Sequence, residues 1–348
     1  MDLKEQMVDA IVKEIEMQKD YLAGESINTI YFGGGTPSLL TKEELGKILH
    51  SIDRNEAAEI TLEANPDDLS RQKLDDLLSI GINRLSIGIQ SFRNDVLTFF
   101  NRAHNADDAV RSIKDARSAG FNNISIDLIY GIPDQPNDSW RKDIAEALSF
   151  RPEHISAYSL TIEERTVFGK WKASNKLSPM NEETVAEQFE MLMAILGDNG
   201  YDHYEISNFA LPGFYSRHNS SYWSRAKYLG VGPGAHSYDG TSRQFNVSNN
   251  PIYVRKISGG EIPFEREVLK REDEINEYLF IGLRTKNGVD LEFMTREFDF
   301  RLSEEQHRYI QDLVRLGKIT AEGGIVKLTN KGKLLADKIA SDLFVSSE

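Results

Sequence analysis

Residues 29–37 read TIYFGGGTP, and this stretch decides the fold of the chain. Its first four residues form a short apolar, β-branched run that is typical of a buried strand. The glycines that follow expose backbone N–H and C=O groups with no Cβ in the way, so an amino-acid-like zwitterion can lie against the main chain. A P-loop and a dinucleotide fingerprint are both excluded, because neither Gly-Lys-Ser/Thr nor Gly-x-Gly-x-x-Gly is present here.

Similar strand-like runs recur about every 30 residues, which is the length of a βαβ unit. The predicted strands are Thr29–Phe32, Glu59–Glu63, Arg84–Ile89, Asn123–Tyr130 and His154–Thr161. Segments with helical periodicity lie between and after them, at Leu69–Ser79, Asp107–Ala119, Ser139–Leu148 and Glu183–Leu196, and Thr41 with Glu44 forms a capping box ahead of another helix. Repeated βα units without a Rossmann fingerprint predict an α/β fold, a partial TIM-like barrel.

The two ends of the chain depart from this repeat. The chain opens with an amphipathic helix whose apolar stripe runs from Leu3 to Ile15 and whose predicted cap is Asp2, so the predicted barrel lacks its first strand. Beyond residue 270, helices, a hairpin that turns at residues 322–324 and a closing helix Asn330–Leu343 predict a winged-helix-like module. We therefore predict a barrel over residues 1–235 and a C-terminal helical domain over residues 236–348.

Polar residues interrupt the predicted strands where each strand ends, which is where barrels place their chemistry. Any one of these residues alone has an ordinary structural explanation, but their coincidence favours a ligand site. Acceptors for ammonium and ribose hydroxyl groups are available there, and an arginine nearby can pair with a carboxylate. The residues are Glu63, Gln90, Asp127 and Thr161 at strand ends, with Arg102 as the arginine.

Composition restricts the class of protein. The net charge of −14 over 348 residues argues against a broad nucleic-acid or membrane surface, since such surfaces need clustered Lys and Arg. No apolar run approaches the roughly 20 residues of a membrane span, and we expect a cytoplasmic protein. The chain contains no cysteine, so no thiolate is available for a metal, and we predict no metal ligands.

Five motifs together resemble the radical S-adenosylmethionine (SAM) family of oxygen-independent coproporphyrinogen III oxidases and their haem-chaperone relatives, the HemN/HemW group. They are YFGGGTPS at 31–38, LEANP at 62–66, SIGIQSF at 86–92, DLIYGIP at 127–133 and GPGAH at 232–236. The resemblance implies a partial barrel that binds SAM, with Gly34 and Glu63 contacting the SAM bound to a 4Fe–4S cluster. It also implies that six positions match those holding a second SAM in the oxidase branch: Gly35, Thr36, Gln90, Arg102, Asp127 and Thr161.

One departure from the family concerns the iron–sulfur cluster. The family's Cys-x-x-x-Cys-x-x-Cys loop precedes the helix with which this chain begins, and the chain has no cysteine. We expect that the natural reading frame continues upstream and encodes this loop, and reading the upstream codons tests that expectation. The alternative is a degenerate protein without a cluster. Because clusters are held by thiolates, we expect the present chain to carry none, we assign no catalytic residue, and whether it is an enzyme stays open.

A second departure selects the branch of the family. His218, Tyr222 and Trp223 form a His-Asn-x-x-Tyr-Trp motif that resembles the haem-chaperone side, with Arg217 beside it. An imidazole ligand and aromatic packing suit a porphyrin, although a buried histidine with two core aromatics is the structural alternative. The resemblance implies a haem chaperone that delivers haem to a respiratory acceptor protein. The alternative functions are an oxidase that acts on coproporphyrinogen III and a winged-helix DNA-binding regulator. The negative net charge disfavours the DNA-binding regulator.

Overall fold

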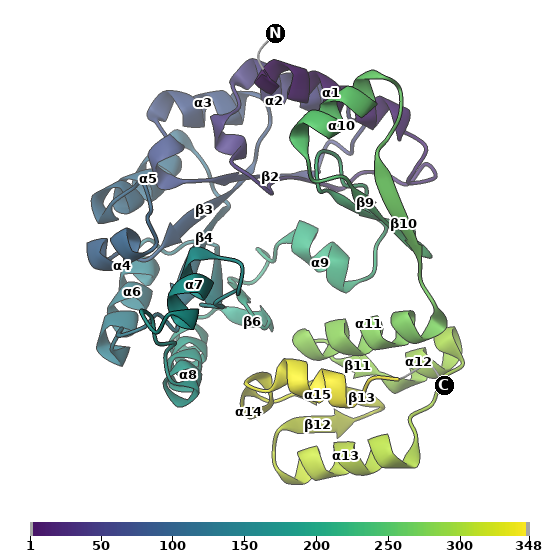
Figure 1. Cartoon of the computed structure of the whole chain (residues 1–348). Coiled ribbons are helices and arrows are strands. Elements are labelled where there is room, and N and C mark those ends of the chain that lie inside the picture. Colours follow the sequence, from purple (N-terminus) through teal and green to yellow (C-terminus); the bar gives the residue numbers. More distant parts are fainter. Residues whose placement is uncertain (1–2, 346–348) are drawn as a thin grey trace.

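The computed structural model describes residues 3–345, and its main element is a curled sheet wrapped by helices on one side (Figure 1). The sheet has seven strands in the order β1-β2-β3-β4-β5-β7-β6, the first five parallel and the last two antiparallel to their neighbours. This is a half-barrel, as the repeated βα units predict. The strands are β1 (Thr29–Phe32), β2 (Glu59–Ala64), β3 (Arg84–Gln90), β4 (Ile124–Tyr130), β5 (His154–Ser159), β6 (Asp202–Glu205) and β7 (Asn208–Ala210).

The helices of this unit cover the outer face of the sheet, and the predicted capping box between Thr41 and Glu44 starts α2. Two short helices, α4 and α7, were not predicted because each lies in a segment without an extended apolar period. The helices are α1 (Leu3–Met17), α2 (Lys42–His50), α3 (Arg71–Ser79), α4 (Asn94–Phe99), α5 (Ala106–Ala119), α6 (Asn137–Ser149), α7 (Val167–Ala173) and α8 (Glu182–Asp198). The predicted cap Asp2 lies outside the described residues.

The two faces of the strands differ in chemistry. Side chains such as Leu62, Leu85 and Ile126 point outward and are fully buried in one core with the covering helices. Alternate residues point inward and are largely polar, because side chains alternate between the faces of a strand. The inward row includes Thr61 and Arg84. The half-barrel therefore encloses polar groups instead of a second apolar core.

A second sheet joins the N-terminal helix to the later part of the chain. It contains β8 (His236–Tyr238), β9 (Ser242–Asn246) and β10 (Phe264–Val268) in the antiparallel order β10-β9-β8. The helix α10 (Asn250–Ser258) follows β9 and packs on α1, burying Ala10 against Tyr253 and Ile257. A further helix, α9 (Arg217–Trp223), lies between this sheet and the half-barrel in Figure 1.

The C-terminal region has its own apolar core and occupies the lower right of Figure 1, beneath β10 and α9. The predicted hairpin is present, since Glu322 pairs with Ile325 across the turn. The predicted closing helix is wrong in one respect, because it is interrupted at residues 334–335. The elements are α11 (Arg271–Arg284), β11 (Val289–Asp290), α12 (Leu291–Phe298), α13 (Glu304–Arg315), β12 (Ile319–Glu322), β13 (Ile325–Leu328), α14 (Asn330–Lys333) and α15 (Ala336–Asp342).

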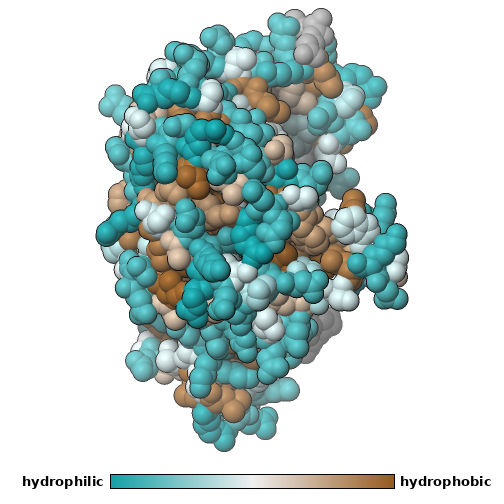
Figure 2. Space-filling view, turned by 90° about the vertical axis from the view of Figure 1, so that its left-hand side faces the viewer, coloured by the Kyte–Doolittle hydropathy of each residue, from teal (hydrophilic) through white to brown (hydrophobic). Residues whose placement is uncertain are grey.

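The surface agrees with the charged composition. On the face shown in Figure 2, hydrophobic areas are small and hydrophilic residues surround them. Within residues 3–345, no helix combines the length and the apolar character that crossing a membrane requires.

Candidate functional site

A polar cavity of about 200 Å³ opens at the carboxyl ends of β1, β2 and β3, beside the middle of β4. Most of the residues predicted for the site line it, but Gly34 and Thr161 do not. Its wall consists of Gly35, Thr36, Pro37, Ser38, Glu63, Ala64, Asn65, Ser86, Gly88, Gln90, Arg102 and Asp127. The rule that barrels place polar groups at strand ends thus identified residues that the fold brings together.

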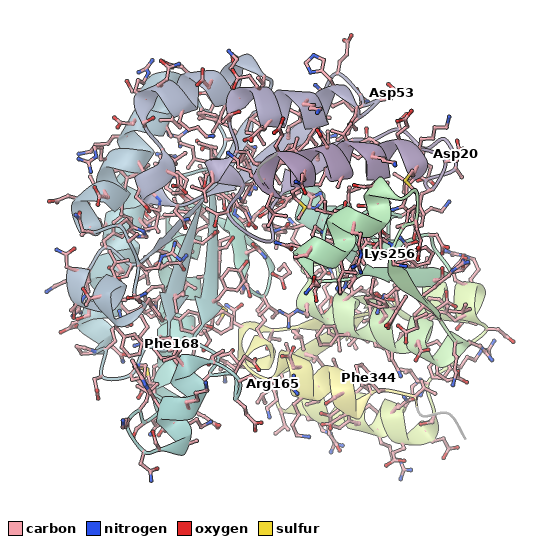
Figure 3. The ribbon with its side chains drawn as sticks, turned by 45° about the horizontal axis from the view of Figure 1, so that its top comes forward. Asp20, Asp53, Arg165, Phe168, Lys256 and Phe344 are labelled. Carbon is pink, nitrogen blue, oxygen red and sulfur yellow. The ribbon has the colours of Figure 1, made fainter. Side chains whose placement is uncertain are left out.

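Thr161 lies apart from this cavity because β5 ends at Ser159, two residues earlier than predicted. The chain then leaves the sheet, and Thr166 caps the short helix α7 by accepting a hydrogen bond from the Gly169 N–H at 3.1 Å. Figure 3 labels Arg165 and Phe168 on this segment. Thr161 is exposed at its start, so the strand-end argument fails for this residue.

The glycine loop forms one side of the cavity and its glycines play different parts. Gly34 has a φ of +77°, a conformation that side-chain-bearing residues rarely adopt, and a Cβ there would meet open space. A Cβ at Gly33 would instead lie 2.7 Å from Cε1 of Tyr31 and 2.9 Å from Cδ of Glu63. Gly33 is therefore needed for close packing of the loop against these two side chains.

On the opposite side, β3 is distorted at the cavity. Gln90 has a φ of +65°, and the pairing of β3 with β4 shifts between Ile87 and Gln90. Such left-handed conformations cost free energy and gather at functional sites. A Cβ at Gly88 would lie 2.9 Å from Nε2 of Gln90, so this glycine makes room for the Gln90 amide at the cavity wall.

Arg102 reaches the cavity from the loop after α4. Its Nη2 donates to Oδ1 of Asn65 at 2.6 Å and to the Gly88 carbonyl at 3.4 Å. These bonds fix the guanidinium plane at the rim. Nη2 is thus engaged, and the hydrogens of Nε and Nη1 remain as charged donors for a carboxylate in the cavity.

Asp127 provides the titratable group of the site. Burial raises its pKa to about 6, the charge of Glu63 acts in the same direction, and a hydrogen bond from Ser156 opposes both. The Ser86 hydroxyl also donates to its carboxylate oxygens at 3.4 Å. The ionised carboxylate is thus held in the cavity at a cost in stability, as binding groups often are.

Asp127→Asn is expected to stabilise the protein at neutral pH. Folding raises the pKa of the Asp127 carboxyl from 3.8 to about 6. Below pH 4 the carboxyl is protonated and does not destabilise the folded state, whereas above pH 6 it is ionised and its burial lowers the free energy of unfolding by the full amount. The free energy of unfolding of the variant should exceed that of the parent by about 3 kcal/mol at pH 7.5, and the difference should disappear at pH 4. Urea denaturation across this range measures it.

Asp53→Asn serves as the control, because that carboxylate is exposed and projects outward near the top of Figure 3. It should change stability little at any pH. A difference for Asp127→Asn that is independent of pH would contradict the assignment.

Beneath the cavity lies an arginine that is unusually enclosed. Arg84, at the start of β3, is only 1 % exposed, and its Nε has no hydrogen-bond partner among the described residues. Its charge lowers the pKa of Asp127 and of His218, so the guanidinium acts on both the cavity and α9. Its positive charge therefore partly balances the negative charge of carboxylates on the inward face of the sheet, such as Asp127.

The helix α9 carries the predicted motif and is fixed to the half-barrel at its first turn. The backbone N–H groups of Arg217 and His218 donate to the two carboxylate oxygens of Glu59, at 3.2 and 3.0 Å. The Arg217 guanidinium donates to the Ala57 carbonyl at 2.8 Å, so it is already engaged. A carboxylate at the start of a helix satisfies the N–H groups that lack partners within the helix.

Both ring nitrogens of His218 are engaged. Nδ1 lies 3.0 Å from the Thr29 hydroxyl and Nε2 lies 3.0 Å from the Tyr222 hydroxyl. Burial, aided by the charge of Arg84, lowers its pKa to about 4, so the imidazole is neutral at physiological pH. Neutral imidazole is the form that binds metals. Trp223 belongs to the same helix, and its buried indole N–H has no partner among the described residues.

Sequence reasoning missed two residues that connect these parts, Tyr31 and Glu59. Tyr31 donates to Oε1 of Glu63 at 2.7 Å and its ring stacks on His218. The alternation of strand side chains was the available signal, since Thr29 and Tyr31 share the inward face of β1. That pattern does not reveal which distant side chains Tyr31 and Glu59 contact.

The described residues provide no donors for an iron–sulfur cluster. Among residues 3–345, no three His, Asp or Glu side chains converge as a metal site would need, and the chain has no cysteine. Thiolates hold such clusters, so the donor set does not fit this group.

Comparison with known proteins places these features in a family. Residues 4–147 match the model of the Radical SAM superfamily, and residues 269–335 match the HemN C-terminal domain. The chain is 36% identical to the Heme chaperone HemW of Bacillus subtilis, covering 97% of this chain and 88% of the relative. It is 35% identical to the Heme chaperone HemW of Lactococcus lactis, covering 96% of this chain and 89% of that relative.

The fold has a counterpart of known structure. Coproporphyrinogen III oxidase (HemN) from Escherichia coli superposes with a TM-score of 0.84 at 23% identity, covering 98% of this chain and 83% of that chain. At this identity the likeness supports the fold alone.

Proposed function

The chain belongs to the HemW family of haem chaperones within the radical SAM superfamily, and from this membership we propose that it binds haem through α9 and holds SAM in the half-barrel. In this proposal haem is cargo, passed to an acceptor protein of respiration in the cytoplasm. The observation that carries it is the position of His218, a neutral imidazole that shares α9 with Tyr222 and Trp223. This helix is anchored to Glu59 at the start of β2, and the His218 ring stacks on Tyr31 of β1.

The cavity residues fit SAM in their chemistry. Glu63 and Asp127 offer carboxylate acceptors for an ammonium group and ribose hydroxyls, and Arg102 matches a carboxylate. The backbone of residues 33–35 adds an open surface, because a Cβ at Gly34 or Gly35 would meet no protein atom within 4 Å. When bound, SAM supplies a sulfonium-activated adenosyl group. The residues of this chain bind and orient it.

Glu63→Ala is expected to weaken SAM binding, because the carboxylate is the acceptor nearest the glycine loop. Loss of a hydrogen bond to a charged group costs roughly 2 kcal/mol, so the dissociation constant should rise about thirtyfold. Gly34→Val should weaken binding as well, because a β-branched residue is strained at a φ of +77° and would distort the loop beside the cavity. Isothermal titration calorimetry with SAM measures both. Equal affinities in all three proteins, or a parent that does not bind SAM, would contradict this part of the proposal.

His218→Ala is expected to impair haem binding. Titration of the parent with haemin should give a saturable Soret shift, and the variant should bind at least about tenfold more weakly because it lacks the iron ligand. His236→Ala is the matched control: that histidine is exposed, and its ring contacts Phe245 with centroids 4.8 Å apart. If His218→Ala binds haemin as tightly as the parent does, the His-Asn-x-x-Tyr-Trp motif has a structural role and does not bind haem.

A further inference from the structure

Two candidate sites, the SAM cavity and His218, are connected through one side chain. The hydroxyl of Tyr31 donates to Oε1 of Glu63 at 2.7 Å. The ring of the same tyrosine stacks on His218, with centroids 4.8 Å apart and planes inclined by 19°. No other described residue is hydrogen-bonded to Glu63 and stacked on His218, so Tyr31 is the direct link between the cavity wall and α9.

This link is tightly packed. A Cβ at Gly33 would lie within 2.9 Å of both Tyr31 and Glu63, so the glycine loop closes over the pair. Burial, followed by the charge of Glu63, raises the pKa of Tyr31, so its hydroxyl stays protonated and remains a donor. Because these side chains are closely packed, a displacement of the Tyr31 ring also displaces Glu63 or His218.

The other end of the link cannot bind a ligand without moving. Both ring nitrogens of His218 are held by hydroxyls, from Thr29 and from Tyr222. Burial raises the pKa of Tyr222 to about 12, so this hydroxyl too stays protonated. For either nitrogen to bind iron, the hydroxyl that occupies it has to leave, which changes the hydrogen bonding of the ring that stacks on Tyr31.

We propose that Tyr31 is a positioning residue that couples the two sites: it holds Glu63 by its hydroxyl and His218 by its ring, so each site changes the affinity of the other. This rests on the proposed function only for the identity of the ligands. The coupling is reciprocal, because binding free energies around a closed cycle must balance. Couplings of this kind change affinities by about 5- to 150-fold.

The first test needs no ligand. In protein labelled with ¹⁵N-histidine, the imidazole resonances of His218 are compared in the parent, Glu63→Gln, Tyr31→Phe and the double variant. Glu63→Gln should shift the His218 resonances when Tyr31 is present and leave them nearly unchanged in the Tyr31→Phe background. Tyr31→Phe keeps the stacked ring and removes only the hydroxyl, so a role in packing alone does not predict this dependence.

The second test applies the same four proteins to haemin. Among the described residues, the Glu63 side chain is hydrogen-bonded to Tyr31 and to no residue of α9. Glu63→Gln should nevertheless change the haemin dissociation constant about fivefold or more with Tyr31 and less than about twofold with Phe at this position. Ser38→Ala is the control, because Ser38 lines the same cavity but donates its hydrogen bond to Asp68 at 2.6 Å. It should leave the His218 resonances in place.

The outcomes separate the coupling from the haem proposal. If haemin binds none of the proteins, haem binding is wrong, and the resonances of His218 still decide the coupling. If Glu63→Gln leaves these resonances unchanged, or shifts them equally without the Tyr31 hydroxyl, the coupling is overturned while haem binding stands.

Discussion

Glu14→Ala is expected to lower the free energy of unfolding by about 4 kcal/mol, since it removes an acceptor that serves four buried donors. Glu14 is completely buried on α1. One carboxylate oxygen accepts from the Gly232 N–H at 2.8 Å and from the Tyr253 hydroxyl. The other accepts from the Asn246 amide at 2.6 Å and the Gln18 amide at 3.0 Å.

Alanine at this position leaves these donors inside the protein without water or a partner, which is more costly than the loss of the bonds themselves. Urea denaturation at pH 7 measures the change. Glu16→Ala is the matched control, because its side chain is exposed on the same helix, and it should stay within about 0.5 kcal/mol of the parent. A similar small effect for Glu14→Ala would show that α1 does not hold the GPGAH turn in place.

Gly33→Ala is expected to destabilise the protein by about 2 kcal/mol through overpacking. The added methyl group would lie 2.7 Å from Tyr31 and 2.9 Å from Glu63, closer than real Cβ contacts, so one of these side chains has to move. The hydrogen bond between them should weaken as a result, and SAM affinity should fall with it.

The control for this prediction is Gly35→Ala, two residues further along the same loop. A Cβ at Gly35 would meet open space, and the residue does not have a positive φ, so the free energy of unfolding should change by less than about 0.5 kcal/mol. Denaturation of both variants decides the matter. Equal effects at the two positions would mean that flexibility of the loop, and not packing on Tyr31, governs stability.

Local sequence patterns predicted most of the half-barrel. The predicted first strand, Thr29–Phe32, agrees at both ends with the structure, and the capping box at Thr41 starts its helix. Strands were located well because each is a short apolar, β-branched-rich run and the runs recur about every 30 residues. Helices α4 and α7 were missed, since six or seven residues give too short a period to recognise.

The cavity was predictable for a related reason. Carboxyl ends of parallel strands meet at one edge, so polar residues there converge whatever the details of packing. Glu63 and Gln90 follow this rule, whereas Asp127 lines the cavity from the middle of β4. Thr161 does not, because the end of β5 is set by the chain turning into α7, and strand ends are poorly marked in sequence.

The sequence by itself thus determined the repeat of strands, the edge at which polar groups gather and the motif on α9. Only the tertiary structure decided which of these groups touch: Tyr31 with Glu63 and His218, and Glu14 with Gly232. The physical reason is distance along the chain. Periodicity records contacts between near neighbours, whereas a hydroxyl or carboxylate can pair with many distant partners, and the partner is chosen by how whole elements pack.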